Sequence, residues 1–377
     1  MTEKNLNPKD FDIQSGILSS DSPIFSKLKS FSDKYNRQNS ITFNNRFFDW
    51  QYKQAFDLFP LKDNGFYFCK NSVGNIIGYC SASNAPYLWN GKKITGRFFH
   101  EWYSNPTQSG STTALLARQL ELSPIFQVMG ASIQNINVLL RMRDSIWFPL
   151  RRVYVVLDSK NASLLLQNKR KDACYLLDAL QLRIPKSTEH PAGKHITRFG
   201  DAYQKTWTRI SKHFTAAVDK SSKYMNWRYV DHPIFSYSRH VYTSSRGKSV
   251  YIIWRAEYVR EKQITVARIC EIIGASVDLP EIIPSFFQNL IDADIVFADF
   301  FCTNNTINSV LKTTGFYEAI PLIELDIPRL FSPLQDDFRK TLHSVISVSK
   351  EYFSTPAQNT SECYFTKGDV NQDMPNV

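Results

Sequence analysis

The chain carries the sequence FDWQY at residues 48–52 and returns to it at residues 225–229, which read MNWRY. Two further blocks repeat in the same order. An Ile-Thr pair at residue 94 is followed by Glu101, and an Ile-Thr pair at residue 264 is followed, at the same distance, by Glu271. The sequence INVLLR at residues 136–141 then matches INSVLK at residues 307–312. Three blocks in register at nearly constant spacing predict a duplicated unit.

A chain of 377 residues exceeds the length at which one hydrophobic core usually keeps growing, so two domains are expected. The apolar content of 43% is ample for two packed cores. The expected division is an N-terminal extension at residues 1–40, a first domain at 41–158, a helical linker at 159–200, a second domain at 201–335, and a C-terminal helix and tail at 336–377.

The net charge of +10 suits polyanionic ligands such as nucleotides, coenzyme A or RNA, and does not choose among them. The six cysteines lie far apart, without a CxxC pair or a histidine at metal-ligand spacing, which argues against zinc and against a disulfide framework. Because the sequence has neither a signal-like start nor a run of about 18 apolar residues, we expect no membrane span and a reducing cytoplasmic location.

Hydrophobic periodicity predicts the same order of elements in both halves. In the first half, two strands around a turn at residues 72–75 form an antiparallel hairpin, and further strands alternate with helices up to residue 157. The second half repeats this order from residue 250 to residue 313. The predicted fold class is α/β (α+β), with a mixed, mostly antiparallel sheet flanked by helices in each half.

A loop of small residues, NPTQSGSTT at 105–113, joins a strand that ends near Trp102 to a helix. Backbone N–H groups at such a helix start form a ready site for a pyrophosphate. The simpler interpretation is that Ser111 and Thr112 only cap the helix, since hydroxyl residues are common at that position.

These blocks resemble the GNAT acyltransferase superfamily, whose cofactor loop has the form Q/R-x-x-G-x-G/A. Residues 108–113 fit that frame, although Ser111 and Thr113 stand where the family usually has Gly or Ala. The resemblance implies acetyl-CoA as co-substrate, without a metal. It places the cofactor against the following residues: Trp102, Gln108, Ser109, Gly110, Ser111, Thr112 and Thr113.

The second half departs from that pattern. Residues 274–280 replace the cofactor loop and include Asp278, a carboxylate expected to repel a pyrophosphate. Leu311, and Leu140 in the first half, stand where the family often has a tyrosine that protonates the leaving thiolate. We therefore expect acyl-CoA on the first domain, with the second shaping the acceptor site or supporting the first.

N-acyl transfer requires a base for the acceptor amine. Glu101 is the first candidate, because Glu271 repeats it, and the alternative is that this Glu only bonds a neighbouring backbone or Arg. His100 is the second candidate, and strand alternation predicts that it faces away from Glu101. Tyr103 and Tyr317 are the candidates to replace the missing acid, and the alternative for each is a core position.

Three other segments have both functional and structural interpretations. Trp50 and Trp227 are predicted to fill equivalent core positions. Asp231 and His232 are candidates for binding the acceptor, although a polar turn before Pro233 explains them equally well. Asp369 lies in a tail that resembles tandem GNAT-like proteins of surface-polysaccharide pathways, and could bind sugar hydroxyls.

The resemblance implies transfer of an acetyl group from CoA to the amine of a UDP- or dTDP-linked amino sugar for lipopolysaccharide or capsule synthesis, with no nucleic acid favoured as partner. Two alternatives remain open. One is an aminoacyl-tRNA-dependent peptidyltransferase, which commonly has a coiled-coil arm that is not predicted here. The other is a tandem GNAT module without catalysis. The oligomeric state is not predicted.

Overall fold

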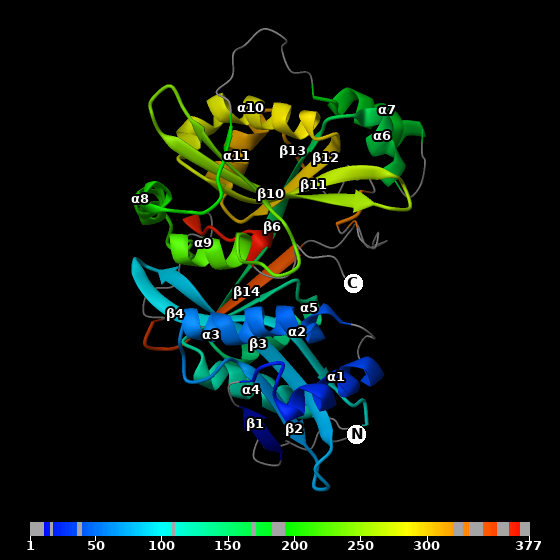
Figure 1. The fold of residues 1–377 in the computed structure, drawn as a ribbon, viewed down its shortest axis with the longest axis vertical. Helices are drawn as coiled ribbons and strands as arrows, with labels where there is room; N and C mark the ends of the chain where they lie inside the picture. The colour runs from blue at the N-terminus through cyan, green and yellow to red at the C-terminus, as the bar shows by residue number, and fades with distance from the viewer. Residues whose placement is uncertain are drawn as a thin grey trace.

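A computed structural model describes residues 11–15, 18–35, 40–107, 110–166, 171–182, 193–319, 327–329, 331, 342–352 and 362–369. Its centre is one sheet of 14 strands that runs through both halves, with helices on its faces (Figure 1). The strand order is β1-β2-β3-β4-β5-β14-β6-β12-β11-β10-β9-β7, with β13 (Tyr317–Glu318) paired to β6 and β8 paired to β3. The predicted mixed, mostly antiparallel fold is confirmed.

The first half contains the predicted hairpin and the alternating elements that follow it. Their bounds are β2 (Phe66–Lys70), β3 (Ile76–Trp89), β4 (Lys92–Ser104), α4 (Ser111–Leu122), β5 (Ile125–Met129), α5 (Ile133–Met142) and β6 (Ser145–Val156). The N-terminal segment adds β1 (Asp12–Ser15), which pairs with β2, and α1 (Pro23–Tyr35), which buries Phe25, Leu28 and Phe31. Part of the expected extension therefore packs on this half of the sheet.

The second half repeats the order. Its elements are β9 (Ser238–Thr243), β10 (Ser249–Val259), β11 (Ile264–Ile273), α10 (Leu279–Asp292), β12 (Ile295–Cys302) and α11 (Asn305–Thr313). The connection between the halves contains α6 (Ser159–Ala162), α7 (Lys171–Leu180), β7 (Lys194–His195), α8 (Asp201–Ile210), β8 (Ala216–Val218) and α9 (Ser222–Tyr229). Both parallel pairs, β4 with β5 and β11 with β12, lie inside otherwise antiparallel surroundings.

The halves exchange strands where they meet. β14 (Leu342–Val348) comes from the end of the chain and inserts between β5 and β6 of the first half. β6 continues into the second half, where Val156 pairs with Phe297 and Arg151 with Cys302 of β12. The C-terminal helix expected from residue 336 is wrong over residues 342–348. Val345, Ile346 and Val348 are β-branched and buried, and the strand supplies the backbone partners that β5 and β6 need.

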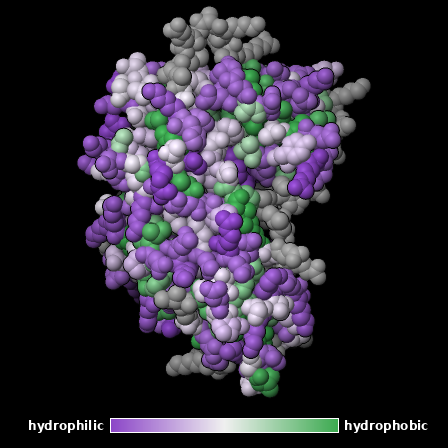
Figure 2. Space-filling view, viewed as in Figure 1, coloured by the Kyte–Doolittle hydropathy of each residue, from purple (hydrophilic) through white to green (hydrophobic). Residues whose placement is uncertain are grey.

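Hydrophilic side chains cover most of the face seen in Figure 2, and the apolar residues gather in buried clusters. The largest cluster runs through the junction and includes residues of both halves, such as Trp50, Phe98, Trp227 and Phe300. The two copies of the Trp-x-Tyr block lie on short helices at this junction, on α9 and on a π-helical turn (Asp49–Gln54) between α2 (Asn45–Phe48) and α3 (Ala55–Leu58). Among the described helices, none combines the length and the apolar character that a bilayer crossing requires.

Candidate functional site

An opening lies between β4 and β5. The two strands pair over two positions, Arg97 with Phe126 and Phe98 with Gln127, and β4 then continues to Ser104. Within the described residues, no strand pairs with β4 on that edge beyond Phe98. Phe99 to Ser104 are all partly exposed, whereas the three residues before them, Gly96 to Phe98, are buried. The site that the sequence predicts is therefore centred on an accessible stretch of strand edge.

A β-bulge at His100 shapes this edge. Ser81 of β3 faces Glu101 and the next residue, Ala82, faces Phe99, so His100 is the extra residue. Phe99 and Trp102 contact each other, with ring centroids 5.3 Å apart, and pack on the side of α4. His100 and Glu101 both lie beside Tyr52 on the other side. The prediction that they face opposite sides was wrong, because the bulge breaks the alternation on which it depended.

The environment of His100 differs from that of Glu101. The Nε2 atom of His100 lies 2.8 Å from the Oγ atom of Ser83. Burial, and then the nearby charge of Arg228, lower the pKa of His100 to about 3, so its ring is neutral at pH 7. Glu101 is partly exposed. Its charge adds to burial in raising the pKa of Tyr52 well above the usual value. An imidazole with so low a pKa is a poor base, which leaves Glu101 as the better candidate.

The start of α4 adjoins this edge. Gly110 is the N-cap residue and has a left-handed backbone with φ of 90°, a conformation that glycine adopts without steric strain. The buried Ser111 faces the sheet, and the Oγ1 atom of Thr112 donates to the Oγ atom of Ser104 at 2.8 Å. Neither hydroxyl caps the helix, which corrects the simpler interpretation of this pair. The side chain of Thr112 instead links α4 to β4, and Thr113 is exposed.

Two of the predicted cofactor residues, Gln108 and Ser109, lie outside the described residues. The helix itself is linked to β4 through the buried Arg97, which also forms an ion pair. The Nη2 atom of Arg97 lies 2.7 Å from the Oδ1 atom of Asp63, and its Nη1 atom donates to Gln119 of α4 at 2.9 Å. Tyr103 packs on Tyr79, with ring centroids 5.9 Å apart.

The second half has the corresponding bulge, at Cys270. Ile253 faces Glu271 and Trp254 faces Ile269. β11 and β12 diverge in the same way, since their pairing ends at Ile269 and Phe300. The bulge and the divergence thus occur next to the glutamate in both halves.

In the second half, the chain's own C-terminal segment, residues 362–369, fills that divergence. The hydroxyl of Tyr364 donates to the carbonyl of Ile272 on β11 at 2.9 Å. The N–H of Thr303, just after β12, donates to the carbonyl of Phe365 at 3.0 Å. The segment also pairs with β8 through Tyr364 and Ala217. A substrate therefore has no room beside Glu271.

Glu271 belongs to a buried cluster that holds this segment. The Nζ atom of Lys220 donates to Glu271 at 2.6 Å and also to Asp369, and all three side chains are fully buried. The hydroxyl of Tyr229 donates to the Oε1 atom of Glu271 at 2.9 Å. Burial raises the pKa of Glu271 to about 7, against the opposing effect of Lys220. Burial also raises the pKa of Asp369. In Lys220, burial acts to lower the pKa, but the two carboxylates outweigh it and raise the pKa.

Solved structures of acyltransferases share this architecture. An N-myristoyltransferase of Saccharomyces cerevisiae with bound myristoyl-CoA is similar with a TM-score of 0.51 and 10% identity, over 92% of this chain and 80% of its own. A probable N-acyltransferase of Enterococcus faecalis V583 has a TM-score of 0.54 and 9% identity, over 91% and 74%. A GCN5-related N-acetyltransferase of Anabaena variabilis ATCC 29413 has 0.52 and 11%, over 89% and 72%. The chain has the GNAT fold. No protein-family model matches it, and no curated protein matches its sequence.

Within this GNAT fold, the side chains of the predicted acceptor residues have different surroundings. Asp231 is exposed and forms an ion pair with Arg198 at 2.8 Å. His232 is buried against Trp50, and its Nδ1 atom accepts from the N–H groups of Ile234 and Phe235. Burial, with Arg228 and Arg255, lowers the pKa of His232 to about 2. Asp369 is enclosed with Lys220. Contacts within the chain therefore give the side chains of His232 and Asp369 structural roles.

Tyr52 and Lys220 were not among the residues predicted from the sequence. The repeat contained a signal for Tyr52. Tyr52 and Tyr229 are the last residues of the two FDWQY-like blocks, and each lies beside the glutamate of its own half. Lys220 had no such signal, since it lies in a strand-to-helix connection and its carboxylate partners are 51 and 149 residues away.

Proposed function

We propose that the protein is an acyl-CoA-dependent N-acyltransferase whose reaction takes place in the first half. The observation that carries the proposal is the divergence of β4 from β5 beside the start of α4, with the bulge at His100 and Glu101. An exposed strand edge offers backbone groups to an extended ligand, and a helix N-terminus offers N–H groups to its phosphates. The second half lacks this space because residues 362–369 fill it.

In the proposed reaction, the acceptor amine attacks the thioester carbonyl, a carbon–nitrogen bond forms and the carbon–sulfur bond breaks. Glu101 accepts the proton that the amine loses, directly or through a water. CoA leaves as the thiolate. Tyr103, which follows Glu101 by two residues, is the candidate donor of a proton to that sulfur.

The proposed donor is acetyl-CoA and the proposed acceptor is a UDP- or dTDP-linked amino sugar for lipopolysaccharide or capsule synthesis. The sequence resemblance supports this choice, and the net charge of +10 suits two phosphate-bearing substrates. We place the protein in the reducing cytoplasm, in keeping with its six free cysteines.

Calorimetric titration with acetyl-CoA tests the proposal. We expect binding at one site per chain, and loss of binding in Gly110→Asp, which adds a side chain and a negative charge before α4. Gly74→Asp is the matched control, because Gly74 also has a left-handed backbone, with φ of 83°, and open space around it. Release of free thiol with amino-sugar acceptors then measures turnover. Failure of the wild type to bind acetyl-CoA would reject the proposal in favour of the transfer-RNA-dependent or non-catalytic alternatives.

A further inference from the structure

The second half contains a cavity of about 530 Å³ beside the loop that follows β11. This loop, residues 274–278, corresponds by position to the loop before α4 in the first half. The cavity also borders α8, the turn between β9 and β10, and the start of α11. Its volume lies within the range of sites for small organic ligands.

Cations outnumber carboxylates around this cavity, which Glu362 also lines. Arg209 of α8 and Arg246 and Lys248 of the β9–β10 turn line it, and His213 adds an imidazole. Asp278 also lines it but is buried and bound to Arg246, whose Nη2 and Nε atoms lie 2.7 and 3.1 Å from its Oδ1 atom. These contacts leave the Nη1 atom of Arg246 uncommitted to Asp278. The repulsion of phosphate that the sequence predicts for Asp278 is therefore offset by its partner.

An apolar surface lies beside the charges. The cavity is lined by Ile210, Phe214 and Ile307. Val277, which is 64% exposed, also lines it. The ring of Phe214 stacks on Tyr364, with centroids 5.0 Å apart and planes 14° apart, so its position is fixed by the C-terminal segment. A flat apolar surface next to several cations suits a ligand that combines an aromatic base with phosphates.

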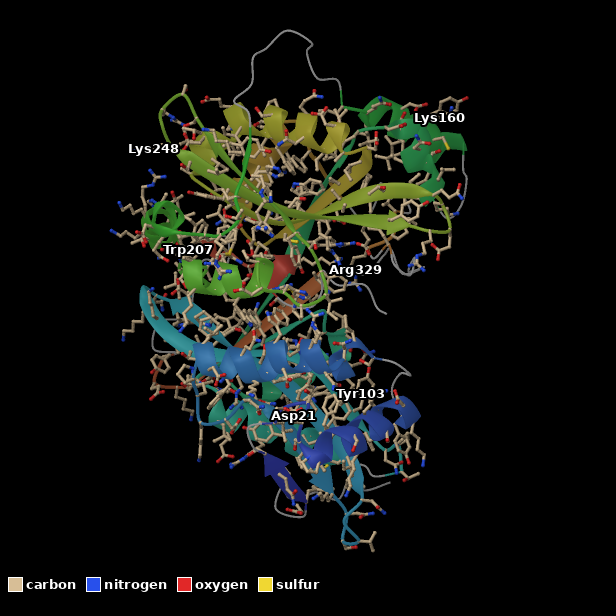
Figure 3. The ribbon with its side chains drawn as sticks, viewed as in Figure 1. Asp21, Tyr103, Lys160, Trp207, Lys248 and Arg329 are labelled. Atoms are coloured by element: carbon tan, nitrogen blue, oxygen red, sulfur yellow. The ribbon has the colours of Figure 1, made fainter. Side chains whose placement is uncertain are left out.

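The cavity and the proposed catalytic edge lie in different halves of the molecule. Figure 3 shows Lys248 in the upper half and Tyr103 in the lower half. Residues 362–369 fill the divergence of β11 and β12 that adjoins the cavity, so a ligand held here does not reach Glu271. The cavity is suited to binding without chemistry.

We propose that this cavity is a second site, separate from the acyl-transfer site, that binds a nucleoside diphosphate. A hollow beside α8, of about 420 Å³, adjoins it through the shared residue Arg209 and carries Lys205 and Lys212. This leaves room for a group attached to the terminal phosphate. The cations gather around a hollow with an apolar wall, which favours a small nucleotide over RNA, since RNA binding typically uses an extended basic track with exposed stacking residues.

The test uses the full chain carrying Gly110→Asp, so that ADP does not bind at the proposed CoA site of the first half. Calorimetry with ADP should show one site, and Arg209→Glu with Lys248→Glu should weaken binding at least ~10-fold, because each removes a charged partner of phosphate. Lys27→Glu with Lys160→Glu, two exposed positions away from the cavity, should leave the affinity unchanged.

A second measurement locates the ligand. Val277→Cys places a thiol at the cavity, and its alkylation rate should fall several-fold with saturating ADP, measured against the wild-type background. Absence of ADP binding at millimolar concentration, or binding that neither protects residue 277 nor responds to the charge reversals, would overturn the proposal. Tighter binding of a transfer RNA than of ADP, lost on the same charge reversals, would also overturn it. Acetyl-CoA turnover is measured separately on the chain with Gly110 intact, so the two proposals fail independently.

Discussion

The indole rings of Trp50 and Trp227 stack on each other at the junction of the two halves, with centroids 4.6 Å and planes 15° apart. The Nε1 atom of Trp50 donates to the carbonyl of Trp227 at 3.0 Å, and the Nε1 atom of Trp227 donates to the carbonyl of Trp50 at 3.2 Å. Each tryptophan therefore donates one hydrogen bond to the backbone carbonyl of the other. The predicted core positions are confirmed, and the two tryptophans join the halves rather than filling separate cores.

A double-mutant cycle measures this contact. Trp50→Ala and Trp227→Ala should each lower the free energy of unfolding by about 3–5 kcal/mol, because each removes a buried ring and leaves a carbonyl without its donor. The double mutant should cost less than the sum by roughly 1 kcal/mol or more. Urea unfolding is the measurement, and Trp147→Ala, at a side chain that is 45% exposed, is the control with little expected effect. Additive effects would show that the rings do not stabilise one another.

Replacement of Glu101 tests the base. Glu101→Gln should lower kcat by ~10²-fold or more and leave acetyl-CoA affinity unchanged, because it removes proton acceptance and keeps the shape. His100→Asn should change kcat only a few-fold, since the low pKa of His100 already makes it a poor base. Glu271→Gln is the matched change in the second half and should retain turnover. If Glu101→Gln keeps wild-type kcat, the base is another residue.

Lys220 should be essential for stability because it compensates two buried carboxylates. Lys220→Met should lower the free energy of unfolding by about 3–5 kcal/mol, the range for removing one partner from a buried ion pair. Adding Glu271→Gln and Asp369→Asn to that variant removes the uncompensated charges, so chemical denaturation should recover most of the loss. A triple variant no more stable than Lys220→Met would mean that geometry, rather than charge, holds residues 362–369.

The raised pKa of Glu271 predicts a specific pH dependence. A carboxyl whose pKa rises from 4.5 unfolded to about 7 folded contributes stability that is complete below pH 4.5 and is lost as the pH rises to about 7. The loss is on the order of 3 kcal/mol. His100 and His232 act in the opposite direction, because their lowered pKa values remove stability as the pH falls below 6.5.

The difference between wild type and Glu271→Gln isolates the carboxyl from the histidines, which both proteins share. In urea unfolding at pH 5 and pH 8, the wild type should lose stability relative to the variant as the pH rises. An unchanged difference between the two pH values would show that Glu271 is charged throughout this range.

The sequence by itself determined the order and type of the elements, because hydrophobic periodicity and turn residues act over short distances. It also placed the two glutamates at equivalent positions, since a repeated block carries its geometry with it. The prediction of a helix over residues 342–348 was wrong. Residues 125–129 of β5 and 145–150 of β6 need backbone hydrogen-bond partners between them, and a strand supplies these partners.

Only the tertiary structure decided which half keeps an open strand edge. The bulge at His100 brings it to the same side as Glu101, and alternation along a strand does not reveal a bulge. The closure of the second half depends on residues 362–369 meeting Lys220 and Glu271, which lie about 90 to 150 residues earlier in the chain. Such contacts depend on burial and on which charges meet, and both are properties of the folded chain.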